Sequence, residues 1–197
     1  MGTRGLYGFY KNGETKTVYN QYDTYPGGLG AVMLKFIKHL QSFDGLRKLF
    51  DRLKIVKEGK KPGKKQLEHA LSIMKPDLNV SSRSMNDWYC ILREAQNNPM
   101  VYSNGLKLIL DSTDFIKDSL FCEWAYIINL DNDTLEVYAG VNKEHQEDNR
   151  YMTDTPDESG YYACKLISTY NLDILLYIDE ETFIKEVNTA AGNEEEE

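Results

Sequence analysis

The segment "GTRGLYGFYKNGETKTVYNQYDTYPGGLG", residues 2–30, holds the side chains with the clearest potential for chemistry. It places a hydroxyl at Thr3, a guanidinium at Arg4, an amide at Asn20 and a carboxylate at Asp23. A hydroxyl becomes an effective nucleophile when a base takes its proton, and the other three groups can orient a substrate. The segment is therefore either one edge of a catalytic site or a hairpin with a structural or binding role.

The same segment also has the composition of a binding surface. Tyr22 and Tyr25 each combine a large apolar ring with a polar tip, which suits half-buried sheets and interfaces. Together with Arg4, they are the residues that we expect to contact a partner. In the purely structural interpretation, the closely spaced glycines relieve crowding while the tyrosines and Arg4 pack around the hairpin.

Other candidate motifs are weak. His39, His69 and His145 are far apart and lack partners at metal-ligand spacing. The run "DNDTLE" lacks the glycine that a calcium loop needs at its sixth position. The run "GGLG" lacks the spacing of a dinucleotide-binding loop and follows a proline rather than a buried strand. The sequence therefore predicts no metal site and no cofactor.

The cysteines and the apolar runs indicate a compartment. Cys90, Cys122 and Cys164 stand alone in apolar surroundings, which is typical of buried free thiols rather than disulfides or a CxxC metal site. No apolar run reaches the length of about 18 residues that a membrane span needs, and no basic-then-apolar leader is present. We expect a cytoplasmic protein without a membrane partner.

Charge is distributed unevenly along the chain. The formal net charge is -8, and residues 173–197 alone account for all of it, so residues 1–172 are balanced. The loop "KEGKKPGKK", residues 57–65, carries a net charge of +4 but no interleaved aromatic residue. A single basic loop in an acidic protein is a poor nucleic-acid footprint, so nucleic-acid binding is not expected. An acidic end favours a partner with basic groups.

Two β-hairpins are predicted near the two ends of the chain. The first centres on Asn12-Gly13, because both positions of this turn must tolerate positive φ. The second covers residues 121–140, with "DNDT" at its turn, and a third β-rich run begins near Tyr161.

Helices are predicted between the hairpins and at the end of the chain. Apolar residues at helical spacing indicate helices over 29–42, 46–53 and 67–74, the last of which Pro76 ends. A fourth helix has Ser84 as its expected N-cap, with Asp87 three residues later. A short terminal helix, residues 179–187, has acids in its first turn.

Strands at both ends with helices between them predict an α+β fold. We expect one antiparallel sheet built from the N-terminal and C-terminal hairpins, with the helices of residues 29–96 packed on it. Residues 1–188 form one domain in this interpretation, and residues 189–197 form a disordered acidic tail.

The combination "GTRG…YNQYDTYPGGLG" with "CEWAYIINLDNDTLEVYAG" resembles a family of uncharacterised proteins of phages, bacteria and fungi that open with GTRG or CTRG. Members with a cysteine start are similar to N-terminal-nucleophile hydrolases, whose first side chain attacks an amide while its own α-amine acts as base. Here Gly2 occupies the cysteine position. The resemblance therefore implies that Thr3 would be the nucleophile if Gly2 were removed, with Arg4, Asn20 and Asp23 orienting the substrate.

Two functions remain open from the sequence. The first is a non-catalytic accessory protein that binds another protein, and the resemblance to phage proteins implies a host-modulating role for it. The alternative is an amidohydrolase of the N-terminal-nucleophile type. The mature N-terminus separates them, because a chain that begins at Gly2 has no side chain for such chemistry.

Overall fold

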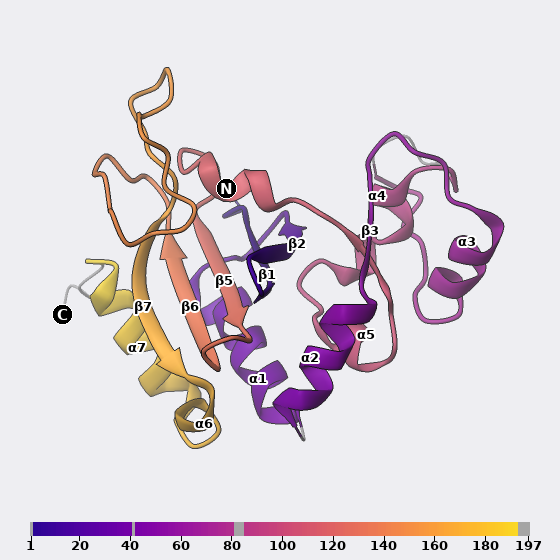
Figure 1. The fold of residues 1–197 in the computed structure, drawn as a ribbon, viewed down its shortest axis with the longest axis horizontal. Helices are drawn as coiled ribbons and strands as arrows, with labels where there is room; N and C mark the ends of the chain where they lie inside the picture. Colours follow the sequence, from indigo (N-terminus) through magenta and orange to yellow (C-terminus); the bar gives the residue numbers. More distant parts are fainter. Residues whose placement is uncertain (1, 41, 81–84, 193–197) are drawn as a thin grey trace.

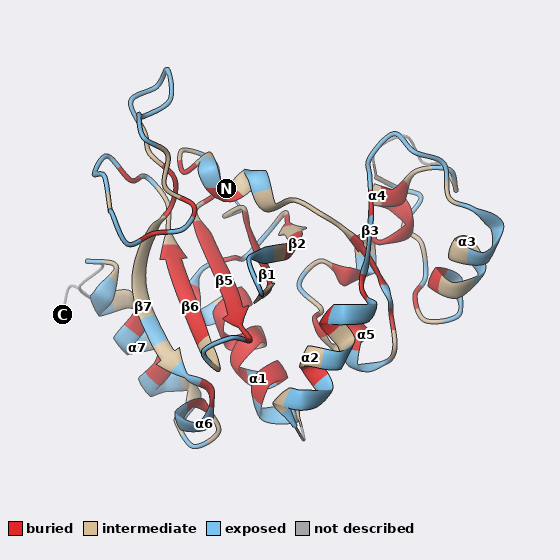
Figure 2. Ribbon diagram, in the orientation of Figure 1, coloured by how far each residue is buried: buried red, intermediate tan, exposed pale blue. Residues whose placement is uncertain are grey.

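A five-stranded sheet organises the protein, in a computed structural model that describes residues 2–40, 42–80 and 85–192 (Figure 1). The strands lie in the spatial order β2 (Glu14–Asn20), β1 (Gly5–Lys11), β5 (Trp124–Asn129), β6 (Thr134–Ala139) and β7 (Lys165–Asn171). Figure 2 shows β5 and β6 buried along most of their length, as expected for central strands. The predicted α+β class is confirmed.

Both predicted hairpins are present. β1 and β2 pair antiparallel around Asn12 and Gly13, whose φ values of 51° and 80° explain why the turn needs this dipeptide. β5 and β6 form the second hairpin, with the predicted "DNDT" turn between them and Asp133 at a φ of 53°.

The two hairpins share one sheet, as predicted, but they join in parallel. Gly5 lies opposite Trp124 and Tyr10 lies opposite Asn129, so β1 and β5 run in the same direction. The expectation of a wholly antiparallel sheet is therefore wrong at this pair. The physical reason is the long segment between the hairpins, because a crossover connection brings the chain back in the same direction.

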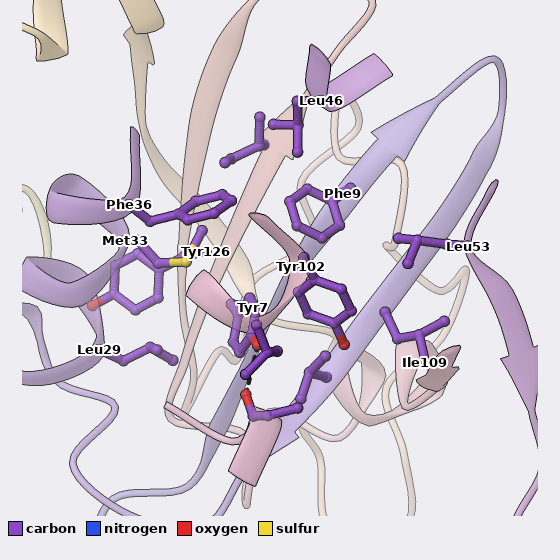
Figure 3. Close-up of a cluster of buried hydrophobic side chains, with 14 of the residues drawn as sticks. Tyr7, Phe9, Leu29, Met33, Phe36, Leu46, Leu53, Tyr102, Ile109 and Tyr126 are labelled. Atoms are coloured by element: carbon purple, nitrogen blue, oxygen red, sulfur yellow. Dashed lines mark hydrogen bonds between the residues drawn. The ribbon is translucent and has the colours of Figure 1, made fainter. Parts of the chain in front are cut away.

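One face of the sheet packs against several helical elements. These include the π-helical turn η1 (Pro26–Gly30), α1 (Ala31–His39), α6 (Leu172–Leu175) and α7 (Glu180–Ala190), and α2 (Phe43–Arg52) also contacts β1. Figure 3 shows the resulting core, in which Met33 and Phe36 of α1 lie beside Tyr126 of β5. Phe9 of β1 contacts Phe36 and meets Tyr102 edge-on, with ring centroids 6.3 and 5.8 Å away. The apolar stripe predicted for the helix over residues 29–42 thus packs on the sheet.

The segment between α1 and β5 forms a second lobe. It contains α2 (Phe43–Arg52), β3 (Lys54–Val56), α3 (Lys64–Leu71), α4 (Trp88–Ile91), η2 (Arg93–Ala95), α5 (Met100–Ser103), β4 (Leu108–Leu110) and η3 (Thr113–Lys117). The helices predicted over 46–53 and 67–74 are present as α2 and α3. The short parallel pair β3–β4 has no signal in the sequence.

Two expectations about this lobe need correction. The helices do not all pack on the five-stranded sheet, since α3 contacts α4 and lies far from that sheet in Figure 1. The predicted N-cap Ser84 lies outside the described residues. Asp87 caps α4 instead, because its Oδ1 accepts a hydrogen bond of 2.9 Å from the Tyr89 amide.

The other face of the sheet packs against the loop of residues 140–164. A second apolar cluster there includes Leu6, Ile127 and Tyr151, together with Cys122 and Cys164. The expectation of buried free thiols is confirmed for all three cysteines.

The predicted terminal helix is present as α7, and the Asp179 side chain caps it by accepting a 2.8 Å hydrogen bond from the Thr182 amide. Thr189 and Ala190, which we expected in a disordered tail, form its last turn instead. Residues 193–197 lie outside the described part of the chain. Within the described part, no helix is long and apolar enough to cross a membrane.

Candidate functional site

The candidate site lies where β1 begins and β2 ends, since Gly5 is directly opposite Asn20. Arg4 precedes β1 and is held through its backbone. Its carbonyl accepts a 2.8 Å hydrogen bond from the Glu123 amide, and its own amide donates to Glu123 Oε1 at 3.2 Å. The Arg4 guanidinium is thereby placed 4.8 Å from the centre of the Phe121 ring. Stacking on an exposed ring leaves the N–H groups of an arginine available to a ligand.

The residues proposed for amide hydrolysis take part in turn contacts. Thr3 Oγ1 accepts a 2.9 Å hydrogen bond from the Thr24 amide. Asn20 is buried, and its Nδ2 donates to the Tyr22 carbonyl at 2.5 Å. Asp23 is exposed, with a φ of 55°. Across the described residues, no hydrogen bond joins Thr3 Oγ1 to Asn20 or Asp23, so these groups shape the turn separately.

The run "GGLG" has a steric explanation. A Cβ at Gly28 would lie 2.1 Å from the Asp23 carbonyl oxygen, to which the Leu29 amide donates a 2.8 Å hydrogen bond. Only glycine permits this close approach of two backbone segments. The turn accounts for the motif without a nucleotide.

The two tyrosines predicted for binding point to different neighbours. Tyr25 is 45% exposed, and its ring lies within 3.6 Å of the position that a Gly27 Cβ would take, close to Ile184 of α7. Tyr22 is 56% exposed and covers Gly2 instead. Of the two tyrosines, Tyr22 is the one placed beside a cationic side chain.

That cation is Arg93 of η2, which the sequence did not single out. Its guanidinium lies 5.9 Å from the Tyr22 ring and 5.3 Å from the Tyr89 ring. One of its terminal nitrogens donates to the Tyr89 hydroxyl at 2.7 Å and also to the side chain of Gln96. We call Arg4, Tyr19, Tyr22, Tyr89 and Arg93 the arginine–tyrosine surface.

Tyr19 connects the two arginines of this surface. Partial burial raises the pKa of the Tyr19 hydroxyl above its ordinary value, with a contribution in the same direction from Tyr89, while the nearby charges of Arg4 and Arg93 act to lower it. The hydroxyl stays protonated at neutral pH and donates to Gln21 Oε1 at 2.8 Å. Both guanidiniums therefore lie close enough to one hydroxyl to affect its titration.

A cavity of about 300 Å³ opens beside this surface. Its lining includes Tyr19, Tyr89, Gln96, Tyr102, Asp111 and Phe115. Phe115 meets the Tyr19 ring edge-on at 5.2 Å, and Asp111 Oδ1 accepts hydrogen bonds from the Thr17 amide at 3.1 Å and the Thr113 hydroxyl at 2.7 Å. The lining thus combines aromatic and aliphatic side chains with two carboxylates, those of Asp111 and Glu58, and the Asp111 carboxylate already has donors. A volume of this size accommodates one side chain or a small ligand.

Long-range hydrogen bonds fix the helical half of the site to the sheet. The buried Tyr7 hydroxyl of β1 donates to the Ala95 carbonyl at 2.6 Å, at the end of η2. The Gln21 amide donates to Gln96 Oε1 at 3.3 Å. Arg93 is therefore held on a braced element rather than on a free loop.

Part of this site had a signal in the sequence. Tyr89 and Arg93 are four residues apart within a predicted helix, and residues at that spacing are neighbours on a helix surface. Phe121 and Asp111 approach the site only through pairing between distant segments, which no local pattern reveals.

The chain matches no protein-family model, no curated protein and no solved structure. In the described part of the chain, no three His, Cys, Asp or Glu side chains lie together as metal ligands. The chemistry of the site therefore rests on its arginines, its tyrosines and the adjoining cavity.

Proposed function

We propose that this protein is a non-catalytic binding protein whose arginine–tyrosine surface holds an acidic side chain of a partner protein. One observation carries the proposal. The guanidiniums of Arg4 and Arg93 lie against aromatic rings, and among the described residues neither has a carboxylate within ion-pair distance.

The chemistry of the two arginines favours a carboxylate. A guanidinium presents five N–H donors in a planar fork that matches a carboxylate, and ring stacking keeps it oriented. Arginine and tyrosine are also the residues that most often dominate the energy of protein interfaces. Because Arg4 directly precedes β1 and Arg93 belongs to η2, a bound acid would bridge the sheet and the second lobe.

The cavity adds a preference for the residue of the partner that lies next to the bound acid. Its aromatic lining by Tyr19, Tyr102 and Phe115 suits an apolar or aromatic side chain next to the acid. Asp111 and Glu58 disfavour a negative charge of the ligand inside the cavity. The expected ligand is thus a peptide with Asp or Glu beside an aromatic or aliphatic residue.

Selection from a display library of short random peptides tests the proposal. The immobilised wild-type protein should enrich peptides that carry Asp or Glu next to an apolar residue. The double variant Arg4→Ala, Arg93→Ala should lose this enrichment, because both charge-assisted hydrogen-bond donors are gone. Arg52→Ala is the matched control, since Arg52 is exposed and belongs to α2, outside this surface.

Two outcomes would contradict the proposal. Enrichment of peptides without acids would show that the arginines do not select the ligand, and equal enrichment by the double variant would place the binding surface elsewhere. Cleavage of the selected peptides that disappears in Thr3→Ala would favour the amidohydrolase instead.

A further inference from the structure

A second charged surface lies in the second lobe, on residues 47–65. Residues 47–65 contain nine lysines and arginines against two acids, a net charge of +7, so the remainder of the chain carries -15. The segment comprises α2 from Arg47 onward, β3, the following loop and the start of α3. Figure 1 places α3 and the acidic helix α7 at opposite ends of the molecule.

The cations of this segment face solvent. Eight of them are exposed: Lys48, Arg52, Lys54, Lys57, Lys60, Lys61, Lys64 and Lys65. Figure 2 shows the loop and α3 as mostly exposed. Within the described part of the chain, Lys64 is the one member of this set with a carboxylate in ion-pair distance, Glu68 at 4.0 Å. The positive charge is therefore not neutralised locally.

A groove beside α2 continues this basic surface. It has a volume of about 500 Å³, and its lining includes Lys48, Arg52 and Lys107 together with the hydroxyl-bearing Ser42 and Ser103. Amines, a guanidinium and hydroxyls are the side chains that contact phosphate oxygens in nucleic-acid complexes. No lining side chain is acidic.

Lys107 links the groove to the lysine-rich loop. Its carbonyl accepts a 2.8 Å hydrogen bond from the Lys54 amide at the start of β3, and its amide donates to His69 Nε2 of α3 at 3.1 Å. The groove, β3 and α3 therefore meet at one residue. We define the basic end as the eight exposed cations and Lys107.

We propose that the basic end binds double-stranded nucleic acid through the phosphate backbone. This role is separate from the proposed recognition of an acidic peptide. The expectation against nucleic acid considered residues 57–65 alone, whereas the folded chain joins them to Lys48, Arg52 and Lys107.

The composition of the basic end favours nucleic acid over an acidic protein. Eight of its nine exposed cations are lysines, and lysine is depleted at protein interfaces but common at phosphates. No aromatic residue lies between residues 51 and 65 on which an unpaired base could stack. The surface therefore suits the regular phosphates of a duplex, read without sequence preference.

The salt dependence of binding to a fluorescein-labelled DNA duplex of random sequence is the direct test. Binding followed by anisotropy should weaken steeply as KCl rises, because each lysine–phosphate contact releases a condensed counterion. The triple variant Lys57→Gln, Lys60→Gln, Lys61→Gln should lower the slope of log Kd against log salt by about 3. The double variant Arg52→Gln, Lys107→Gln should lower it by about 2.

The matched control changes net charge equally, but outside the basic end. Lys117→Gln, Lys143→Gln, Lys185→Gln should leave the slope unchanged, and Arg93→Ala should bind duplex as the wild type does. The proposal fails if the control and the triple variant lose the same slope, or if polyglutamate competes as well as unlabelled duplex. It also fails if sedimentation at low salt shows that the basic end instead holds the acidic end of a second copy.

Discussion

Two clusters of arginine and tyrosine occupy different parts of this protein, and in only one of them does a carboxylate pair with the arginine side chain. In the first, Arg150 donates from both terminal nitrogens to the buried Glu136. Glu136 also accepts from Asn129 at 2.8 Å and from the Tyr138 hydroxyl at 2.9 Å, while the Tyr10 ring lies 4.0 Å from the Arg150 guanidinium. We call this the closed cluster.

The arginine–tyrosine surface uses the same residue types without the acid. Arg4 lies on Phe121, and Arg93 lies between Tyr22 and Tyr89. We infer that an arginine paired with a buried carboxylate has a structural role, whereas an arginine without such a partner can bind a ligand. Glu136 attaches the loop of residues 140–164 to the sheet through Arg150, whereas Arg4 and Arg93 keep donors for an acid from outside.

The largest expected effect follows from breaking the closed cluster. Arg150→Met leaves Glu136 buried without its counter-charge, which costs about 3–5 kcal/mol in the free energy of unfolding. The matched variant Arg93→Met removes an arginine that has no acid, so we expect a loss below about 1 kcal/mol. Urea denaturation of both proteins measures the difference, and equal losses would abolish the distinction between the clusters.

A smaller effect is expected from Tyr7→Phe, which removes one of the two donors of the buried Ala95 carbonyl and leaves the Asn98 amide at 3.2 Å. The unfolding free energy should fall by about 0.5–1.5 kcal/mol, the net contribution of one hydrogen bond. Peptide binding should also weaken, because Ala95 ends the element that carries Arg93. Tyr126→Phe is the control: its hydroxyl donates to Thr24 rather than to η2, so Arg93 should keep its position. Equal weakening in both variants would contradict this bracing role.

Alkaline pH should weaken the closed cluster through Tyr138. Burial raises the pKa of Tyr138 well above its ordinary value, and the charge of Glu136 raises it further. The folded state then holds its proton more tightly than the unfolded state, so this contribution is complete below about pH 10 and is lost as pH rises further. Urea denaturation between neutral pH and pH 11 should show a shallower decline for Tyr138→Phe, by up to about 1.4 kcal/mol per pH unit. An identical decline would contradict the assignment.

The smallest expected effect comes from adding a carboxylate to the arginine–tyrosine surface. Phe121→Glu introduces a carboxylate where a ring now lies against Arg4. Because the position is exposed, stability should rise by no more than about 1 kcal/mol. Peptide binding should nevertheless fall, since the new acid competes with the ligand, and Phe121→Gln should bind better than Phe121→Glu. Tighter binding by the glutamate variant would argue against an acidic ligand.

Local sequence patterns were sufficient to predict those parts of the fold that depend on residues adjacent in the sequence. The Asn12-Gly13 dipeptide predicted the first hairpin because the turn requires positive φ at both positions. The apolar stripe that includes Phe36 predicted a helix of the core because its residues repeat at helical spacing. The parallel pairing of Gly5 with Trp124 depends instead on how a long crossover folds, which neither strand encodes.

The candidate site divides in the same way. Arg4 and Tyr22 could be identified from the sequence because they lie in a segment of unusual composition. Both belong to the arginine–tyrosine surface. Tyr25 belongs to the same segment but lies near α7, directly before the π-helical turn. Arg93 reaches Tyr22 only through tertiary packing, so its role could not be read from its neighbours.

The central claim is that Arg4 and Arg93 together hold one acidic group. Calorimetric titration of a selected acidic peptide into the wild type and into Arg93→Ala tests it most directly, with the same peptide carrying Gln for its acid as the second ligand. We expect Arg93→Ala to weaken binding of the acidic peptide by roughly 2 kcal/mol, which is a factor of about thirty in Kd, and to leave binding of the Gln peptide almost unchanged. Equal weakening for both peptides would contradict it.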